Sequence, residues 1–222
     1  MTRLPLRFDG PVTLVGGGAL DRSMLEEARE LAPDLVAADG GANLLADWGL
    51  PVAALIGDMD SVEAPNRVAG AEIVALAEQD STDFEKCLYA TKAPFYLAAG
   101  FTGGRVDHML AVFNAMLRRP EPPVVLIGEE EVIALAPPGR TLVLELWPGA
   151  RVSFFPLGPA KGIASEGLAW SVEGLAMAPD GRIGTSNRAE EAAVMVGFDR
   201  PGILVMLERA ALSTLIHAVT RV

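Results

Sequence analysis

The sequence contains few thiol or imidazole groups. It has one cysteine, Cys87, and two histidines, His108 and His217. A single cysteine excludes an intrachain disulfide, and these residues have no spacing that suits a zinc site. Cys87 lies among residues of helical character, next to Lys86. This setting favours a small, buried or half-buried core residue over a catalytic thiol.

Positive charge and long apolar runs are also scarce. The chain has 18 Lys and Arg against 29 Asp and Glu, which gives a formal net charge of −11 and a pI near 4.6. Such a surface repels nucleic-acid phosphates and anionic lipids, so we expect neither a nucleic-acid nor a membrane partner. The N-terminal residues 1–7 lack the apolar segment of a signal peptide, and no later run is long enough to span a bilayer. We therefore expect a soluble, cytoplasmic protein.

Three widespread catalytic motifs are missing. The sequence contains no G-x-G-x-x-G, no G-x-x-x-x-G-K-[ST] and no G-x-S-x-G. A Rossmann dehydrogenase, a P-loop kinase and an α/β-hydrolase are therefore all poor matches.

The 222 residues suggest one or two domains, and the two halves of the chain have different patterns. In residues 1–120, short apolar segments alternate with helical ones, and the apolar segments do not alternate with polar residues. This pattern is typical of a parallel sheet covered by helices on both faces. The expected strands are Val12–Val15, Leu35–Ala38, Ala53–Ile56, Glu72–Ala75 and Phe95–Ala99. The expected helices begin at the capping boxes Ser23–Glu26 and Thr82–Glu85 or cover Ala42–Trp48 and Asp107–Leu117.

The segment Arg118–Pro123 is rich in proline and is predicted to be a linker. In residues 121–222, short strand candidates are separated by Gly and Pro turns, which indicates a small antiparallel sandwich or barrel. The segment after Glu208 is either a helix or a further strand, with a helix favoured. The strand candidates are Val124–Ile127, Glu131–Ala134, Thr141–Leu146, Arg151–Phe155, Ala192–Val196 and Ile203–Leu207.

Acidic residues follow three of the strands expected in the first half. Asp39 follows one strand, Asp58 and Asp60 follow the next, and Asp80 and Asp83 follow a third after a short loop. Ligands of open parallel sheets bind at this edge, and carboxylates gathered there need a cation, for which Mg²⁺ is the best match. The alternative is that these aspartates only cap helices and fill turns. Their recurrence after three strands favours the metal.

A glycine-rich segment, Gly100–Gly104, precedes Arg105, Asp107 and His108 at the start of a helix. Backbone N–H groups of glycines and a helix N-terminus favour phosphate, and Arg105 adds a planar cation. Asp107 is expected to bind a second metal, to orient Arg105 or to cap the helix. His108 is either a ligand contact or a packed helix residue. Gly16–Gly18 is a weaker signal of the same kind.

Six segments in order resemble the motifs of thiamine pyrophosphokinases, and the resemblance covers Val12 to Leu207. They are Ala38–Asn43, Gly57–Ser61, Asp80–Lys86, Gly103–His108, Ser165–Trp170 and Gly184–Asn187. The resemblance implies a Rossmann-like, three-layer α/β domain with a mostly parallel sheet, followed by an antiparallel β-sandwich. It also implies a homodimer in which thiamine lies between the α/β domain of one subunit and the sandwich of the other.

The resemblance also assigns roles to individual residues. Asp58, Asp60 and Asp83 would hold Mg²⁺ and, with Arg105, form the catalytic set. Asp39, Asn43, Thr82, Arg105 and Asp107 would surround the ATP, with His108 as a further candidate. Trp170, Ser186 and Asn187 would contact thiamine, although a lone Trp in a sandwich is usually core and a Ser-Asn pair is an ordinary turn.

The expected reaction is attack of the thiamine hydroxyl on the β-phosphorus of ATP, which yields thiamine diphosphate and AMP. Asp60 and Asp83 are both candidates for the general base. One alternative is a pyrophosphokinase that acts on another hydroxymethyl heterocycle. A second is a non-catalytic sensor of nucleotide or thiamine, which would not need so many carboxylates.

Overall fold

The computed structural model describes residues 4–63, 67–68 and 70–221, so residues 1–3 of the N-terminal segment considered above lie outside the described residues. The chain divides into two units, each treated separately below. Unit 1 comprises residues 1–115 and 126–129, and unit 2 comprises residues 116–125 and 130–222. No helix in the described part of the chain is long and apolar enough to cross a membrane.

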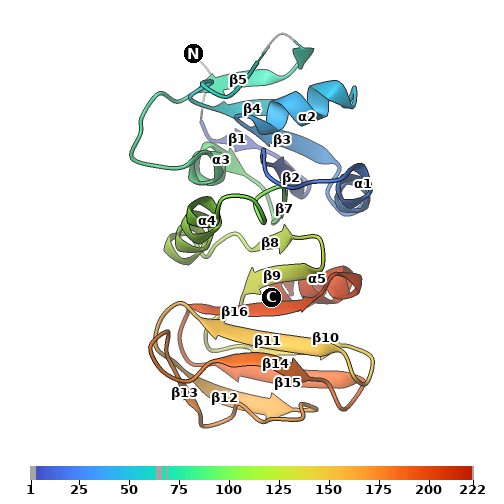
Figure 1. The fold of residues 1–222 in the computed structure, drawn as a ribbon, viewed down its shortest axis with the longest axis vertical. Helices are drawn as coiled ribbons and strands as arrows, with labels where there is room; N and C mark the ends of the chain where they lie inside the picture. Colours follow the sequence, from blue (N-terminus) through green and yellow to red (C-terminus); the bar gives the residue numbers. More distant parts are fainter. Residues whose placement is uncertain (1–3, 64–66, 69, 222) are drawn as a thin grey trace. The chain divides into compact units, whose positions relative to one another are not determined.

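Unit 1 contains a parallel sheet in the order β7-β2-β3-β4-β5 (Figure 1). Every pairing between these five strands is parallel, which confirms the predicted sheet type. A short parallel pair, β1 with β6, forms a separate sheet that the sequence did not predict. The strands are β1 (Leu6–Arg7), β2 (Val12–Val15), β3 (Asp34–Ala38), β4 (Ala54–Gly57), β5 (Glu72–Ala75), β6 (Thr91–Lys92) and β7 (Tyr96–Ala99). The helices are α1 (Arg22–Leu31), α2 (Gly41–Asp47), α3 (Asp83–Ala90) and α4 (Val106–Arg118).

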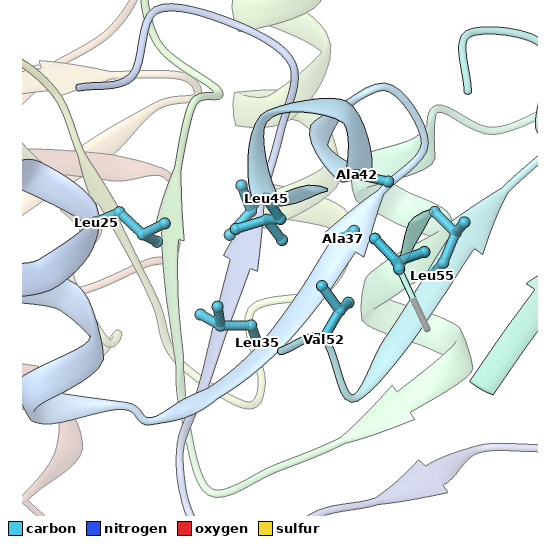
Figure 2. Packing of buried hydrophobic residues seen from close by; sticks show 9 residues of the cluster. Leu25, Leu35, Ala37, Ala42, Leu45, Val52 and Leu55 are labelled. Carbon is cyan, nitrogen blue, oxygen red and sulfur yellow. The ribbon is translucent and has the colours of Figure 1, made fainter. Parts of the chain in front are cut away.

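Helices cover both faces of this sheet. Leu25 of α1 and Leu45 of α2 pack against Leu35, Ala37 and Leu55 of the strands on one face (Figure 2). Helix α3 contacts β3 and β4 from the other side (Figure 1). Strands β2, β4 and β7 are buried at every position, and β3 at all but its first, which explains why their sequences are almost entirely apolar. The edge strand β5 is exposed at three of its four positions.

Two helix starts test the predicted capping boxes. Thr82 caps α3 and accepts a hydrogen bond from the Glu85 N–H at 3.4 Å, as predicted. The prediction for α1 was wrong, because Asp21 and not Ser23 is the N-cap. The Asp21 carboxylate accepts from the Met24 N–H at 2.8 Å and from the Ser23 hydroxyl at 2.6 Å. An ionised carboxylate is the stronger acceptor, so the helix begins two residues earlier than the sequence pattern suggested.

Unit 2 is an antiparallel β structure with sheets in the orders β14-β11-β16-β9 and β10-β15-β12-β13. The rings of Phe154 in β11 and Phe198 in β15 meet edge to face at 5.5 Å, so side chains of the two sheets share a core. The strands are β9 (Glu131–Leu135), β10 (Thr141–Glu145), β11 (Arg151–Pro156), β12 (Ala160–Glu166), β13 (Ala176–Met177), β14 (Gly184–Arg188), β15 (Ala193–Phe198) and β16 (Ile203–Glu208). Strand β8 (Val124–Ile127) has residues in both units.

The end of the chain is helical, which confirms the favoured alternative. A 3₁₀ turn, η2 (Arg209–Ala211), leads into α5 (Leu212–Thr220), which contacts β9, β10 and β16. The sequence did not predict β12, β13 and β14. In particular, Ser186 and Asn187 lie within β14 and not in the turn expected for an ordinary Ser-Asn pair.

Candidate functional site

Three carboxylates gather where β3 and β4 end. Asp39 follows β3, whereas Asp58 and Asp60 follow β4. One oxygen from each of the three residues lies within 4.8 Å of the other two. Adjacent parallel strands deliver the segments that follow them to the same edge of a sheet, which is why residues distant in sequence meet here. The structure therefore brings together Asp39, Asp58 and Asp60, as expected from their places after two neighbouring strands.

Asp39 shapes the turn that carries the other two carboxylates. The residue is 3% exposed, and its carboxylate accepts hydrogen bonds from the N–H groups of Met59 at 3.0 Å and Ser61 at 3.1 Å. A Cβ atom on Gly57 would lie 2.7 Å from the Asp39 Cβ, so only glycine allows this approach. Asp39 itself has φ 42°, a left-handed conformation that Asp and Asn tolerate better than most residues.

Asn43 of α2 holds the same segment from the other side. Its amide donates to the Ser61 carbonyl at 2.9 Å and accepts from the Glu63 N–H at 3.0 Å. Asp39 and Asn43 were expected to surround the nucleotide. The described structure shows their polar atoms bonded to the segment from Met59 to Glu63, so their observed contacts position the acidic turn.

Asp58 has neighbours that favour its ionised form. Its Oδ2 accepts from Gln79 Nε2 at 2.8 Å and lies 3.5 Å from Lys86 Nζ, and its Oδ1 lies 3.3 Å from the Asp60 nitrogen. The hydrogen bond from Gln79, followed by that from the Asp60 N–H and by the Lys86 charge, lowers the pKa of Asp58. Asp58 is therefore ionised at neutral pH, as a cation ligand must be.

Asp83 is linked to this group through a lysine. It is the first residue of α3, and its Oδ1 lies 3.2 Å from Lys86 Nζ. Burial raises the pKa of Asp83, and the Lys86 charge offsets only part of that effect. Burial acts to lower the pKa of Lys86, but the Asp83 and Asp58 charges raise it above its ordinary value. Asp83, predicted to hold metal with Asp58 and Asp60, is outside the group of three close carboxylates among the described residues.

The candidate phosphate residues follow β7. Arg105 binds Asp107 through two hydrogen bonds, Nε to Oδ1 at 3.2 Å and Nη2 to Oδ2 at 2.6 Å. These bonds from Arg105 lower the pKa of Asp107. Both side chains are largely exposed, and His108 is also exposed in the first turn of α4. The contact with Arg105 is consistent with the role of Asp107 in orienting that side chain.

The glycines after β2 and β7 approach one another closely. The Gly18 N–H donates to the Gly100 carbonyl at 2.8 Å, and a Cβ on Gly18 would lie 2.6 Å from that oxygen. Strands β2 and β7 are also where the chain order reverses, because β3, β4 and β5 lie on one side of β2 and β7 lies on the other. Open parallel sheets bind ligands at such a switch point. Gly103 and Gly104 have positive φ values of 76° and 69°, which glycine adopts readily.

The candidate thiamine residues lie in unit 2. Trp170 is 59% exposed, whereas Asn187 is 5% exposed. The Asn187 amide donates to the Trp170 carbonyl at 2.7 Å and accepts from the Trp170 N–H at 3.2 Å. Ser186 has φ 59°, and its N–H donates to the Ser153 hydroxyl at 2.9 Å. Arg188 lies over the Trp170 ring, 5.7 Å from its centroid. Asn187 therefore fixes the backbone that presents the exposed indole.

Sequence reasoning missed Gln79, Lys86 and Arg188. Only Lys86 had a usable signal, because it lies three residues after Asp83 on a predicted helix and so shares a face with it. Its second contact, with Asp58, depends on the packing of α3 beside β4. Cys87 is buried, and burial raises the pKa of its thiol, which confirms that it is a core residue.

Two protein-family models match the chain. One is described as "Thiamin pyrophosphokinase, catalytic domain" and covers residues 25–126, and the other as "Thiamin pyrophosphokinase, vitamin B1 binding domain" and covers residues 142–203. Together they define the class of protein: a kinase with a catalytic domain followed by a domain for its vitamin substrate. The acidic turn after β4, the start of α3 and the whole of α4 fall within the first model, and β12 to β15 fall within the second.

Similar proteins agree with this class. Thiamine pyrophosphokinase 1 of Oryza sativa subsp. japonica is 30% identical over 198 residues, which cover 74% of this chain and 75% of that protein. The chain belongs to the thiamine pyrophosphokinase family. The fold is similar to that of thiamin pyrophosphokinase from Candida albicans, with a TM-score of 0.76, 18% identity and coverage of 90% and 89% of the two chains. The enzyme from Geobacillus thermodenitrificans gives a TM-score of 0.73, 23% identity and coverage of 89% and 96%.

Proposed function

We propose that this chain transfers the terminal diphosphate of ATP to the hydroxyl of thiamine, giving thiamine diphosphate and AMP. The observation that carries the proposal is that the close carboxylates Asp39, Asp58 and Asp60 lie in the part matched by the catalytic-domain model, at the edge of the sheet where ligands bind. Residues 1–120 would bind nucleotide and metal, and residues 121–222 would bind thiamine.

The donor set suits Mg²⁺. Three aspartates supply only hard oxygen ligands, and Mg²⁺ takes one or two carboxylates and keeps its other positions for water and phosphate. Both Asp39 oxygens already accept backbone hydrogen bonds, so Asp58 and Asp60 are the proposed ligands, with Asp83 as the third. A bound Mg²⁺ would neutralise the charge that grows on the phosphate oxygens during transfer.

The other proposed roles follow from charge and position. Arg105, oriented by Asp107, would bind phosphate oxygens with its planar guanidinium group. Thr82 and His108 stand at the N-termini of α3 and α4, the helix ends that favour an anion. Asp60 and Asp83 remain the two candidates for accepting the hydroxyl proton. Diphosphate transfer depends chiefly on such positioning and charge stabilisation.

The proposed thiamine contacts are Trp170, Ser186 and Asn187. The exposed indole offers a flat face to the thiazolium cation, and a desolvated cation–π contact contributes up to ~2 kcal/mol. Asn187 would act by holding the Trp170 backbone, given that its amide is already bonded there. We further propose a homodimer in which these residues complete the active site of the partner subunit.

The test is the product ratio. Incubation with ATP, Mg²⁺ and thiamine, followed by phosphate-resolved chromatography, should yield AMP and thiamine diphosphate in equal amounts. ADP with thiamine monophosphate would instead show an ordinary kinase. AMP release with a different hydroxymethyl heterocycle, but not with thiamine, would show another pyrophosphokinase. Thiamine binding without AMP release would show a sensor.

A further inference from the structure

Lys86 is a buried cation beside an acidic group. Its side chain is 2% exposed, and it is the only buried Lys or Arg in the part of the chain that the structure describes. Lys86 belongs to α3, and its ammonium group contacts Asp58, which follows the end of β4. A charge held in so little water needs partners of opposite sign to remain.

The two partners of Lys86 come from segments far apart in sequence. Its Nζ lies 3.2 Å from Oδ1 of Asp83, at the start of α3, and 3.5 Å from Oδ2 of Asp58, after β4. Asp58 is one of the three close carboxylates. Asp83 lies outside that group and is connected to it by Lys86, which contacts both aspartates. The ammonium group thus lies among the charges that a divalent ion would also attract.

We infer that Lys86 is the resident counter-cation of the acidic group. Its charge offsets the repulsion between Asp58 and Asp83 in the metal-free protein and competes electrostatically with the ion that binds there. This inference rests on the proposed metal site. It predicts opposite effects on the stability of the metal-free protein and on metal affinity. Removing the lysine charge should destabilise the metal-free protein and should at the same time strengthen divalent-metal binding.

The expected gain in metal affinity holds because Asp58 does not depend on Lys86 for its position. Without Lys86, Asp58 would still accept from Gln79 at 2.8 Å, and its turn would still be held by Asp39. Loss of the ammonium group therefore changes the local charge more than it changes the position of Asp58. Two other roles would give different results. A lysine that only packs would not alter metal affinity, and a lysine that binds ATP phosphate would alter nucleotide affinity alone.

The test compares the wild type with Lys86→Met, which keeps a chain of similar length and removes the charge. Mn²⁺ serves as the probe. Its affinity is measured without nucleotide by electron paramagnetic resonance of free Mn²⁺, and Tm is measured in EDTA and in saturating Mn²⁺. We expect a lower Tm in EDTA, Mn²⁺ affinity roughly tenfold tighter than that of the wild type, and an extra Mn²⁺-induced rise in Tm of about 3 °C.

The matched control is Lys92→Met, which removes the same charge from an exposed position on β6 and should behave as the wild type. Equal losses of Tm in EDTA and Mn²⁺ with unchanged Mn²⁺ affinity, or weaker Mn²⁺ binding, would overturn the inference. A change confined to ATP affinity would overturn it as well. If Mn²⁺ neither binds to the wild type nor raises its Tm, the proposed metal site itself is absent.

A second variant covers the case in which Lys86→Met does not fold in EDTA. The double variant Lys86→Met with Asp83→Asn removes a carboxylate together with its counter-ion. It should be more stable in EDTA than Lys86→Met alone, because one repulsive charge is gone. A double variant no more stable than Lys86→Met would contradict the inference, whereas folding of Lys86→Met in Mn²⁺ but not in EDTA would support it.

Discussion

Among single residues, Asp39 has the most constrained side chain of the acidic group. Both of its oxygens accept backbone N–H groups from the turn that carries Asp58 and Asp60. Hydrogen bonds to an ionised acceptor are roughly twice as strong as neutral ones, and burial increases the cost of losing them. The position of Asp58 and Asp60 therefore depends on Asp39, whose two carboxylate oxygens are both bonded to the turn that carries them.

Asp39→Asn tests this dependence at constant size. Asn also tolerates the left-handed backbone of Asp39, so backbone strain does not explain an effect. One oxygen becomes an NH₂ group that faces a backbone N–H, and we expect a loss of about 1–3 kcal/mol in the free energy of unfolding. Denaturant unfolding measures the change. Asp34→Asn, at the exposed start of β3, is the control and should stay near the wild type. Equal stability of both variants would show that the turn does not depend on Asp39.

Asp58→Asn and Asp60→Asn address the chemistry. Each removes a charge from the proposed metal site and leaves the side-chain volume unchanged. Turnover should fall by at least ~100-fold with the fold intact, which is the scale of one strong transition-state contact. Steady-state rates at saturating Mg²⁺ and circular dichroism spectra are the two measurements. Near-normal turnover at saturating Mg²⁺ would exclude both residues from the metal site.

The sequence could predict residues whose role follows from local context. Asp58 and Asp60 share one turn directly after an apolar strand, and Asp39 follows the neighbouring strand, so the order of strands and turns was sufficient to place all three at one sheet edge. The contact of Lys86 with Asp58 joins residues 28 apart, and no local pattern encodes it. The same is true of the hydrogen bonds that Asn43 makes with Ser61 and Glu63, which lie 18 and 20 residues away.

Among elements, the ends of β2 and β7 depend on close backbone approach. Gly16, Gly18 and Gly100 lie so near one another that a Cβ on any of them would fall within 2.6 Å of a carbonyl oxygen. Backbone cannot move aside as a flexible side chain does. Gly16 and Gly18, which belong to the weak phosphate signal of the sequence, are therefore required for packing.

Gly18→Ala and Gly17→Ala form a matched pair. A Cβ on Gly18 would lie 2.6 Å from the Gly100 oxygen, whereas a Cβ on Gly17 would lie 3.5 Å from its nearest neighbour. We expect Gly18→Ala to lower the free energy of unfolding by about 1–3 kcal/mol through overpacking, and Gly17→Ala to be nearly neutral. Urea unfolding of the two variants measures this difference. Similar stabilities of the Gly18→Ala and Gly17→Ala variants would mean that the loops after β2 and β7 move apart readily.

The loop between β5 and α3 is organised by Glu78. Its carboxylate accepts from the Asp80 N–H, from both the N–H and the hydroxyl of Ser81, and from the Tyr89 hydroxyl. The bond from Ser81, followed by that from Tyr89, lowers the pKa of Glu78 to about 2. The neighbouring Gln79 binds Asp58, so this loop also supports the acidic group.

The lowered pKa of Glu78 predicts a pH dependence. A carboxylate with a lowered pKa in the folded state stabilises the fold above its ordinary pKa of 4.5, and this effect disappears as pH falls toward about 2. Glu78→Gln should therefore have a lower Tm than the wild type at pH 7, and the gap should narrow between about pH 5 and pH 3. Thermal unfolding across this range measures the gap. A gap that stays constant with pH would assign the effect to something other than the charge.

Strands with a continuous apolar sequence could be predicted, whereas strands that contain many polar residues could not. Strands β2, β4 and β7 are buried at every position, and β3 is buried at all but its first residue, and their sequences show it. The edge strand β5 is exposed at three of its four positions. Strands β12 and β14 contain Gly, Ser, Lys and Asn, and they pair with neighbours that no local rule identifies. Register with a distant strand decides their structure, and a single sequence does not contain that information.

At the scale of the whole molecule, the proposed homodimer with shared sites predicts complementation between two inactive variants. The metal candidates lie before residue 120, and the thiamine candidates lie after residue 160. Asp58→Asn and Asn187→Ala, each inactive alone, should regain activity after subunit exchange. A mixed dimer would then carry one site with both defects and one site with neither. Recovery should reach at most about one quarter of wild-type activity if pairing is random and the sites are independent.

Verified mixed dimers are the control for that experiment. Two different affinity tags allow them to be purified before the assay. No recovery in purified mixed dimers would mean that each site is complete within one chain. Recovery without detectable mixed dimers would instead point to contamination by wild-type protein.

The path of the chain between its two units limits how genes of this kind can recombine. The chain passes from unit 1 to unit 2 after Ala115, returns after Val125 and leaves again after Glu129. The second of these crossings lies inside β8, after Val125, and the third lies two residues after that strand ends. A chimaera made with a single breakpoint would therefore combine mismatched halves of one folding unit. Exchange of a vitamin-binding module between relatives would therefore have to keep residues 116–125 with the rest of unit 2 and residues 126–129 with the rest of unit 1.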